Sequence, residues 1–390
     1  MPAPRPTSQT EPPLPAVMPA PRPDGWRGEP RLGWLAALRD PELALAWSLP
    51  DWDRVVRMGR AQRLLGRLAE ALDGAALIGR VPPQPARHLV AELRYSRARV
   101  QALTWALQRI GDALADAPYP RVLLKGAAYI GQGLPIAPGR LPSDVDIMVP
   151  RPHLADAQAR LAEAGWHEVP LDDHDQRYYR EWSHEAPPMR HAQHGLELDL
   201  HHAILPPVAR TRVDTDLLLE RVQSSTWPGW QVLAPADQVL HSAAHLFLDA
   251  ELGGRLRDLV DLDGLLRHFG RAPGFGDELA ARARQLGLGV PLALACHHVT
   301  RWLGTPVPAA TLATVAAMGP GPLQRAWLLP AMRAVLWPPE PDASRAVRPQ
   351  AAAWVLLARY HATRMPWRLL LPHLWHKWRA GRAPTDGAQA

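Results

Sequence analysis

Two aspartates in the stretch 141–150 have the type and spacing of metal ligands. Asp144 and Asp146 alternate with apolar residues, a pattern that predicts a short strand with both carboxylates on one face. Their Cα atoms would be about 6.6 Å apart, so the carboxylates repel each other unless a cation lies between them. Mg²⁺ prefers such oxygen ligands. The alternative interpretation is a pair of solvated aspartates on an exposed strand.

A lysine and a glycine mark the end of an earlier apolar strand, which we expect over residues 121–125. Gly126 then lies where this strand gives way to a helix, and a helix N-terminus favours an anion such as phosphate. Lys125 would add positive charge there. Only Lys125 and Lys377 are lysines among the 44 lysines and arginines, which favours a role for the compact ammonium. A simple turn and a lysine retained by chance are the alternatives.

A second alternating stretch, residues 196–201, carries the candidates for a third acidic ligand. Glu197, Asp199 and His201 share one face of the predicted strand, and leucines occupy the other. If this strand is a neighbour of the aspartate strand, a third carboxylate joins the pair. Its position favours Asp199, with Glu197 as the alternative.

Histidines also follow a helical spacing after Pro235. Asp237, His241 and His245 are four residues apart and share one helix face. The His-x-x-x-His spacing occurs in zinc sites, but the glutamate of the His-Glu-x-x-His pattern is absent. We therefore expect satisfied or substrate-facing histidines rather than zinc ligands. Residues 171–190 are polar and predict a loop over the site.

The remaining pattern indicates elements that position these residues within an α+β fold. Apolar spacing predicts helices before residue 118 and again from residue 235 to about 336, around a small mixed β-sheet. The expected organisation has five parts: a disordered Pro-rich tail (1–28), an N-terminal helical region (29–118), a core carrying the candidate site (119–205), a C-terminal helical region (206–340) and a basic, Trp-rich tail (341–390).

Composition and charge limit the classes of function. With 47% apolar and 21% charged residues, the chain is typical of a globular protein. It has no run of about 18 apolar residues that could cross a membrane and no signal-peptide pattern. Its single cysteine predicts a cytoplasmic location. Residues 345–390 carry eight Lys or Arg and one acid, so the net charge of +6 leaves about −1 (6 − 7) for the body. This argues against a broad nucleic-acid surface.

The basic C-terminal tail has its own two interpretations. Tryptophans and arginines are mixed over residues 350–382, a composition that suits an anionic membrane surface or an acidic partner. Alternatively, a helix packs its tryptophans on the body and leaves its arginines in water.

The motifs together resemble a known family. Lys125-Gly126 after an apolar strand, Arg140-x-x-Ser-Asp144-Val-Asp146, and Leu-Glu-Leu-Asp199-Leu-His resemble the uncharacterised bacterial nucleotidyltransferase family of the DNA polymerase β-like superfamily. The later segments His241 to His245 and Arg255-x-Arg-Asp-Leu-Val-Asp261 resemble its C-terminal helical half. The resemblance covers roughly residues 30–340.

The resemblance implies transfer of a nucleoside monophosphate from an NTP to an acceptor hydroxyl that the sequence does not identify. Asp144, Asp146 and Asp199 would be catalytic ligands of Mg²⁺, with Mn²⁺ as an alternative ion. The residues expected to bind the nucleotide phosphates are Lys125, Gly126, Arg140 and Ser143. The residues expected to contact substrate are Glu197, His201, His241 and His245.

One departure from the family pattern leaves other functions open. The superfamily usually has Gly-Ser or Gly-Gly at the turn where Ala127 here follows Gly126, so a phosphate-binding hydroxyl is missing. The chain would then be a catalytically inactive interaction module, such as a toxin–antitoxin or assembly partner. A glycosyltransferase also uses Asp-x-Asp with a metal, but its nucleotide-binding fold normally comes early in the chain, not behind some 120 helical residues.

Overall fold

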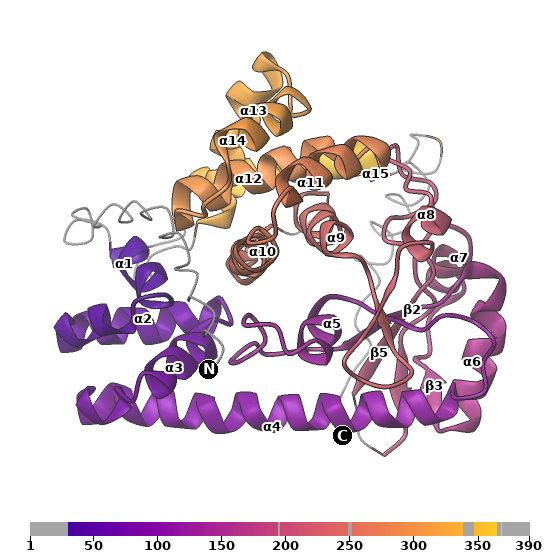
Figure 1. The fold of residues 1–390 in the computed structure, drawn as a ribbon, viewed down its shortest axis with the longest axis horizontal. Helices are drawn as coiled ribbons and strands as arrows, with labels where there is room; N and C mark the ends of the chain where they lie inside the picture. The colour runs from indigo at the N-terminus through magenta and orange to yellow at the C-terminus, as the bar shows by residue number, and fades with distance from the viewer. Residues whose placement is uncertain (1–29, 194–195, 249–251, 338–346, 365–367, 369–390) are drawn as a thin grey trace, which may run out of the picture.

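The computed structural model describes residues 30–193, 196–248, 252–337, 347–364 and 368. One seven-stranded mixed sheet lies among helices that come before and after it in the chain (Figure 1). The expected α+β class, a mixed sheet flanked by helical regions, is confirmed.

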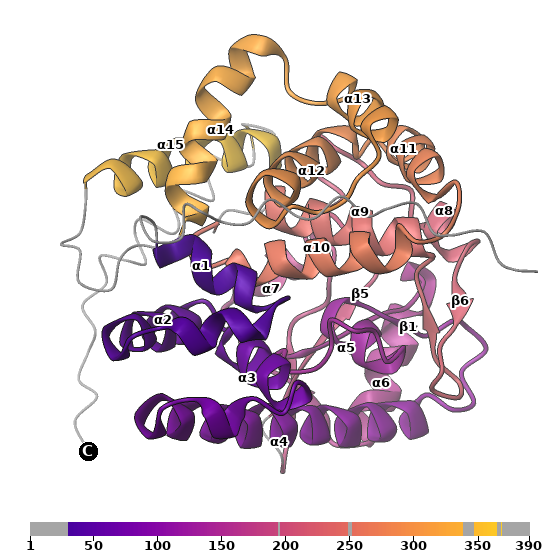
Figure 2. The same ribbon diagram turned by 60° about the vertical axis from the view of Figure 1, so that its left-hand side comes forward.

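The N-terminal helices stack on one long helix, as Figure 2 shows. Ser48 begins the second of them through a capping box, in which its hydroxyl accepts from the N–H of Asp51 and the Asp51 carboxylate accepts from the N–H of Ser48. The long helix has 31 residues, about 46 Å at 1.5 Å per residue. The elements are α1 (Pro30–Ala37), η1 (Pro41–Ala46), α2 (Leu49–Ala61), α3 (Leu65–Gly74), η2 (Ile78–Arg80) and α4 (Pro83–Ala113).

Two contacts from these helices hold the loop that leads to the aspartate strand. Gly66 of α3 lies against Gly139, so closely that a methyl group at Gly66 would be 2.5 Å from the Gly139 carbonyl oxygen. Arg99 of α4 donates to the carbonyl oxygens of Pro142 and Ser143 at 3.0 and 3.1 Å. The N-terminal region therefore positions the approach to Asp144.

The sheet has the strand order β3-β4-β5-β2-β1-β7-β6. Its central strand β2 is parallel to β5 and antiparallel to β1, and all four β2 residues are buried, as expected for a strand covered on both faces. Strands expected near residues 121, 144 and 196 are present, and the sheet continues beyond residue 205. The strands are β1 (Val122–Leu123), β2 (Val145–Met148), β3 (Trp166–Glu168), β4 (Met189–His191), β5 (Glu197–His201), β6 (Gln223–Ser224) and β7 (Gln231–Val232).

Short helices connect the strands, and one of them corrects an expectation. The prediction that residues 171–190 form a loop is wrong for residues 173–181, because the Asp172 carboxylate accepts from the N–H of Asp175 and begins a helix there. The connecting helices are α5 (Lys125–Gly131), η3 (Arg151–His153), α6 (Leu154–Glu163), α7 (Asp173–Glu181) and α8 (Thr215–Leu219).

The C-terminal helices centre on the buried helix α9, which packs on both α10 and α12. Gly287 adopts a left-handed conformation (φ 68°) after the end of α11 and separates it from α12. The helices are α9 (Pro235–Phe247), α10 (Leu256–Phe269), α11 (Phe275–Gln285), α12 (Gly289–Leu303), α13 (Ala309–Ala317), α14 (Pro322–Leu336) and α15 (Val347–Arg364).

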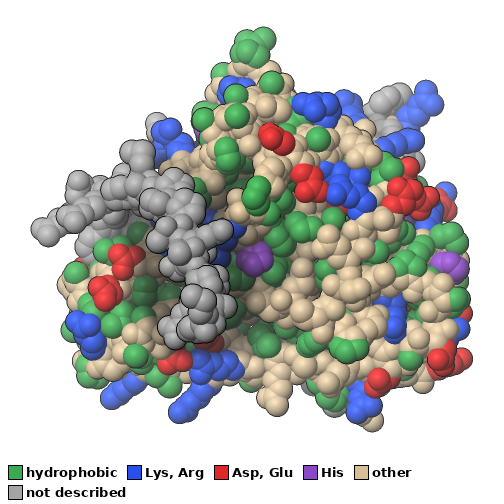
Figure 3. Space-filling view, in the orientation of Figure 1, with side chains coloured by type: hydrophobic (Ala, Val, Ile, Leu, Met, Phe, Trp, Pro, Cys, Tyr) green, Lys and Arg blue, Asp and Glu red, His purple; other side chains and the backbone are tan. Residues whose placement is uncertain are grey.

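Exposed apolar side chains on the C-terminal helices are relevant to the expected membrane or protein partners. Over the described residues, no helix has both the length and the apolar character needed to cross a bilayer. Apolar side chains gather at the top of the face in Figure 3. Leu323 of α14 is 90% exposed. Trp354 of α15 is 70% exposed rather than packed on the body. The Pro-rich tail 1–28 and most of the tail 341–390 lie outside the described residues.

Candidate active site

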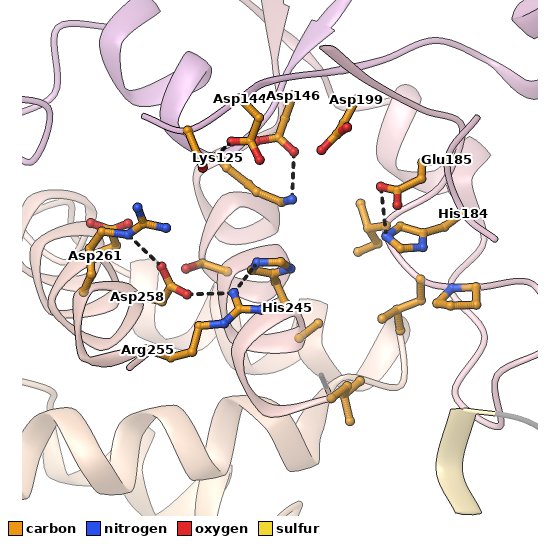
Figure 4. A pocket seen from close by; sticks show the side chains of 18 of the residues that line it. Lys125, Asp144, Asp146, His184, Glu185, Asp199, His245, Arg255, Asp258 and Asp261 are labelled. Atoms are coloured by element: carbon orange, nitrogen blue, oxygen red, sulfur yellow. Dashed lines mark hydrogen bonds and ion pairs between the residues drawn. The ribbon is translucent and has the colours of Figure 1, made fainter. Parts of the chain in front are cut away.

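Asp146 and Asp199 lie opposite each other on two neighbouring parallel strands. The register pairs Asp146 of β2 with Asp199 of β5, and neighbouring strands are about 4.8 Å apart. Asp144 directly precedes β2, and all three carboxylates line one cavity (Figure 4). The alternation seen in the sequence thus brings these three residues together.

Glu197, the alternative third acid, lies elsewhere. It is two residues earlier on β5 and outside the cavity lining. Arg190 of β4 donates to its carboxylate at 2.9 Å across the antiparallel strand pair. Glu197 is therefore paired with Arg190 at the half-exposed end of the strand, and Asp199 is the acid that lies beside Asp146.

Two hydrogen-bonding groups, one from Lys125 and one from His201, contact the same carboxylate oxygen of Asp146. The Lys125 ammonium donates to Asp146 Oδ1 at 2.8 Å, and His201 Nε2 lies 3.1 Å from that atom. Lys125 has the left-handed backbone angle φ 42°, which is uncommon outside glycine and clusters at functional sites. Among the described residues, Asp146 Oδ2 makes no further hydrogen bond, which leaves it available to a cation.

The three aspartates differ in their electrostatics. Burial opposes ionisation of Asp146, but Lys125 and His201 hold its pKa well below the usual range. Burial, together with the neighbouring charges of Asp146, Glu185 and Asp144, raises the pKa of Asp199 to about 8. Burial and the Asp146 charge also raise the pKa of Asp144. One carboxylate is thus neutralised by a lysine, while the other two are destabilised as anions.

The cavity has a volume of about 610 Å³ and draws its walls from all parts of the fold. In Figure 4 the three aspartates lie along the top of the cavity, Asp258, Asp261 and Arg255 lie to its left, and Glu185 with His184 lies to its right. A less polar wall completes it, consisting of Ile204, Leu205, Pro206, Ala209, Ala244 and Leu248. The volume suits a small-molecule or nucleotide ligand.

Arginines from two helical regions face the acidic side. Arg255, which directly precedes α10, and Arg257 of α10 both contact the Asp258 carboxylate, at 3.0 and 3.3 Å. Arg63, between α2 and α3, also lines the cavity, and its side chain makes no hydrogen bond or ion pair with the residues that the structure describes. Together with Arg140 and Asp261, this part of the cavity lining has four guanidinium groups and two carboxylates, which leaves an excess of positive charge.

The residues expected to bind phosphate have different surroundings from one another. Arg140 is buried, donates to Asp261 at 2.9 Å and lies 5.5 Å above the Tyr129 ring. Its guanidinium covers Gly126, where a Cβ would collide with it. Gly126 does not line the cavity, whereas Ser143 does and donates to Asp144 at 2.9 Å. Lys125 is the member of this set whose charge lies beside the carboxylates.

His241 and His245 lie on the buried helix α9. Burial and the nearby Lys125 charge lower the pKa of His241 to about 3 and that of His245 well below its usual range, so both are neutral at pH 7. Arg255 lies 2.9 Å from His245 Nε2. Because arginine only donates, this nitrogen accepts. His245 thus lines the cavity as a neutral group that helps to orient Arg255.

The comparison with protein families decides the relationship. The family described as "Uncharacterised nucleotidyltransferase" matches residues 48–304, more than half of the chain. The chain belongs to this family. No curated protein and no solved structure gives a significant match. The matched range contains all the strands and helices α2 to α12, including the three aspartates and Lys125.

Several cavity residues of this family member escaped sequence reasoning. Glu185 and His184 lie in the polar stretch 171–190, where no regular spacing singles them out. Arg63 is an arginine among many in a helical region that carries no recognisable motif. Arg255, Arg257 and Asp258 belong to the segment that carried the family resemblance, but only the fold places them in the same cavity as Asp146.

Proposed function

We propose that the protein transfers a nucleoside monophosphate from an NTP to an acceptor hydroxyl, with Asp144, Asp146 and Asp199 as ligands of Mg²⁺. The observation that carries this proposal is the direct pairing of Asp146 with Asp199 in the sheet, with Asp144 in the same cavity. Membership of the nucleotidyltransferase family supports the reaction class.

The donor set fits a hard divalent cation. Carboxylate oxygens are the ligands that Mg²⁺ prefers, and Asp146 Oδ2 is available because Lys125 and His201 both use Oδ1. The raised pKa values of Asp199 and Asp144 reflect a cluster in which negative charge is not balanced, which a divalent cation would correct. When bound, the metal would acidify the acceptor hydroxyl and neutralise the departing pyrophosphate.

We assign the nucleotide phosphates to side chains rather than to the α5 N-terminus. The Arg140 guanidinium covers Gly126, so that end of the helix is closed. Lys125 lies beside the carboxylates, and Arg63, Arg255 and Arg257 line the same cavity. A triphosphate between them would meet positive charge along its length, and guanidinium groups bind phosphate oxygens in pairs. Ser143 is close enough to Asp144 to assist at the metal end.

The less polar wall would accept the nucleoside or an apolar part of the acceptor. Ile204, Leu205 and Leu248 line the same cavity as the carboxylates without adding charge. Binding there would remove water from the carboxylate side, where electrostatic interactions strengthen as the local dielectric falls. The proposal requires of the acceptor only a hydroxyl group that would lie within reach of Asp199.

The proposal is tested by Mg²⁺-dependent pyrophosphate release from each of the four NTPs, together with nucleotide binding. Asp146→Asn and Asp199→Asn should each abolish Mg²⁺-dependent binding of a non-hydrolysable NTP. Glu197→Gln is the matched control, because Glu197 is on the same strand but outside the cavity. If Asp146→Asn binds Mg²⁺ and nucleotide as the wild type does, the mechanism is wrong. NTP binding without pyrophosphate release in the presence of varied acceptors would favour the inactive interaction module.

A further inference from the structure

A second group of candidate ligands lies beside the aspartates, where a short segment pairs with the end of β5. Glu185 forms an antiparallel β-bridge with His201. The Ala186 N–H donates to the Leu200 carbonyl and the His202 N–H to the His184 carbonyl, both at 2.9 Å. Residues paired in this way present their side chains to the same face, with Cβ atoms about 5 Å apart. The backbone therefore holds the side chains of Glu185 and His201 together.

Three ligand atoms converge at this place. His201 Nδ1 lies 3.5 Å from Glu185 Oε2, and His184 Nε2 lies 3.9 Å from the same oxygen. The ligand atoms of these three residues are all within 4.8 Å of one another. Tetrahedral ligands about 2.1 Å from a zinc ion lie about 3.4 Å apart. The observed spacing therefore requires movements of only a few tenths of an ångström at the two measured edges.

His201 is oriented as a metal ligand would be. Its side chain is 0% exposed, and its Nδ1 atom has no hydrogen-bond partner among the described residues. Its Nε2 atom faces Asp146 Oδ1, and an ionised carboxylate only accepts, so Nε2 donates. In the neutral imidazole, Nδ1 then carries a lone pair that faces the Glu185 oxygen. Two acceptors facing each other repel, and a cation between them would attract both.

The contact with Asp146 also matches the usual surroundings of such a ligand. Metal-binding histidines commonly donate their second ring nitrogen to a carboxylate, which fixes the tautomer and the ring orientation. A direct Nδ1–H···O hydrogen bond to Glu185 is disfavoured, because 3.5 Å exceeds the normal N···O range of 2.7–3.2 Å.

We propose that His184, Glu185 and His201 bind one transition-metal ion of the Zn²⁺ class, separate from the Mg²⁺ site of the three aspartates. Two imidazole nitrogens and one carboxylate suit Zn²⁺, whereas Mg²⁺ prefers oxygen ligands alone. His184 and Glu185 line the cavity, so the remaining coordination position faces it. Three protein ligands with an open position are typical of catalytic rather than structural zinc sites. This proposal does not depend on nucleotidyl transfer.

The test is Zn²⁺ titration of the metal-free, full-length protein after removal of any affinity tag, in 10 mM Mg²⁺. We expect one Zn²⁺ per chain, and a Kd at least tenfold weaker in His184→Gln and in Glu185→Gln. His167→Gln is the control, because His167 is an exposed histidine on β3. Far-UV circular dichroism and melting curves confirm that each variant is folded.

Cobalt gives an independent readout of the ligands. Co²⁺ in the wild type should show visible absorption bands of a four- or five-coordinate ion, and these should be lost in His184→Gln but kept in Asp199→Asn. The proposal is overturned if the wild type binds no Zn²⁺ in the presence of Mg²⁺. Equal Zn²⁺ affinity in His184→Gln and His167→Gln would overturn it too, as would loss of Zn²⁺ binding in Asp199→Asn alone. Because no nucleotide is present, these outcomes are independent of the nucleotidyltransferase test.

Discussion

The ammonium of Lys125, just past the end of β1, lies 2.8 Å from Asp146 Oδ1 on the neighbouring strand. Both side chains are largely buried. The three aspartates are therefore not equivalent, because Asp146 alone has a lysine partner. From the sequence, repulsion within the cluster predicts that Asp146→Asn leaves the metal-free stability unchanged or raises it. The lysine contact reverses that expectation, since this substitution would leave Lys125 without its partner.

Replacing Lys125 should therefore destabilise the protein through Asp146. Lys125→Met leaves a buried carboxylate with only His201 as a donor, and removing one partner of a buried pair costs about 3–5 kcal/mol. The double variant Lys125→Met with Asp146→Asn removes the unpaired charge, and we expect it to recover at least half of that loss. Urea unfolding of the two single variants and the double variant measures the coupling. Strictly additive losses would mean that the contact contributes nothing.

Asp199 should make the metal-free protein less stable as the pH rises. Its folded pKa of about 8 is above the unfolded value of about 3.9, so the folded state binds more protons between these values. The contribution to stability is complete below about pH 4 and is lost as the pH rises to about 8. Between pH 6 and pH 8.5 this loss is on the order of 2 kcal/mol, because each pKa unit corresponds to about 1.4 kcal/mol.

The comparison that isolates this effect is Asp199→Asn. Unfolding free energies at pH 6 and pH 8.5, in EDTA, should fall for the wild type and change less for the variant, because both share all other titrating groups. Adding Mg²⁺ at pH 8.5 should restore the wild type and leave Asp199→Asn unaffected. Parallel pH profiles for the two proteins would contradict the prediction.

Arg63 should contribute to nucleotide affinity without contributing to stability. Its side chain lines the cavity and makes no ion pair with the described residues, so Arg63→Gln removes a charge that only the ligand would satisfy. A charge-assisted hydrogen bond contributes about 1.5 kcal/mol, equivalent to a roughly tenfold increase in Kd for an NTP. Arg57→Gln is the control, since Arg57 pairs with Asp53 on the surface of α2. Equal affinity in both variants, by titration calorimetry, would remove Arg63 from the phosphate site.

The close approach of α3 to the loop before β2 should be sensitive to a single methyl group. Gly66→Ala would place its Cβ 2.5 Å from the Gly139 carbonyl oxygen, and we expect a loss of about 1–3 kcal/mol from the backbone shift. Gly74→Ala, at the exposed end of the same helix, meets nothing within 4 Å and should gain about 0.5–1 kcal/mol from helix propensity. Urea midpoints of the two variants should therefore move in opposite directions. A midpoint for Gly66→Ala at or above that of the wild type would show that the loop yields easily.

Local patterns in the sequence predicted the part of the site that lies on strands. Because side chains alternate along a strand, the spacing of Asp144 and Asp146 and the position of Asp199 could be interpreted before any fold was known. Family resemblance supplied the order of the elements. The pairing of Asp146 with Asp199 also required β2 and β5 to be neighbours, which is a property of the whole sheet.

The rest of the site depends on contacts between distant segments. From its place before Asp144, Arg140 is predicted to bind phosphate. In the structure its guanidinium donates to the carboxylate of Asp261, 121 residues later. Glu185 acquires its importance only because its segment pairs with His201. Only the folded structure shows that Arg63, between α2 and α3, lines the cavity. In each case no local period or motif encodes the partner, and only tertiary packing selects it.

The cavity lining runs from Arg63 to Thr363, which has a consequence for the order of biosynthesis. At about 5–20 residues per second, a ribosome adds Arg257 roughly 3–12 s after Asp199. During that interval the growing chain has its acidic cluster and Lys125 but neither Arg255 nor Arg257. The candidate site of a nascent chain therefore carries its carboxylates several seconds before these two arginines.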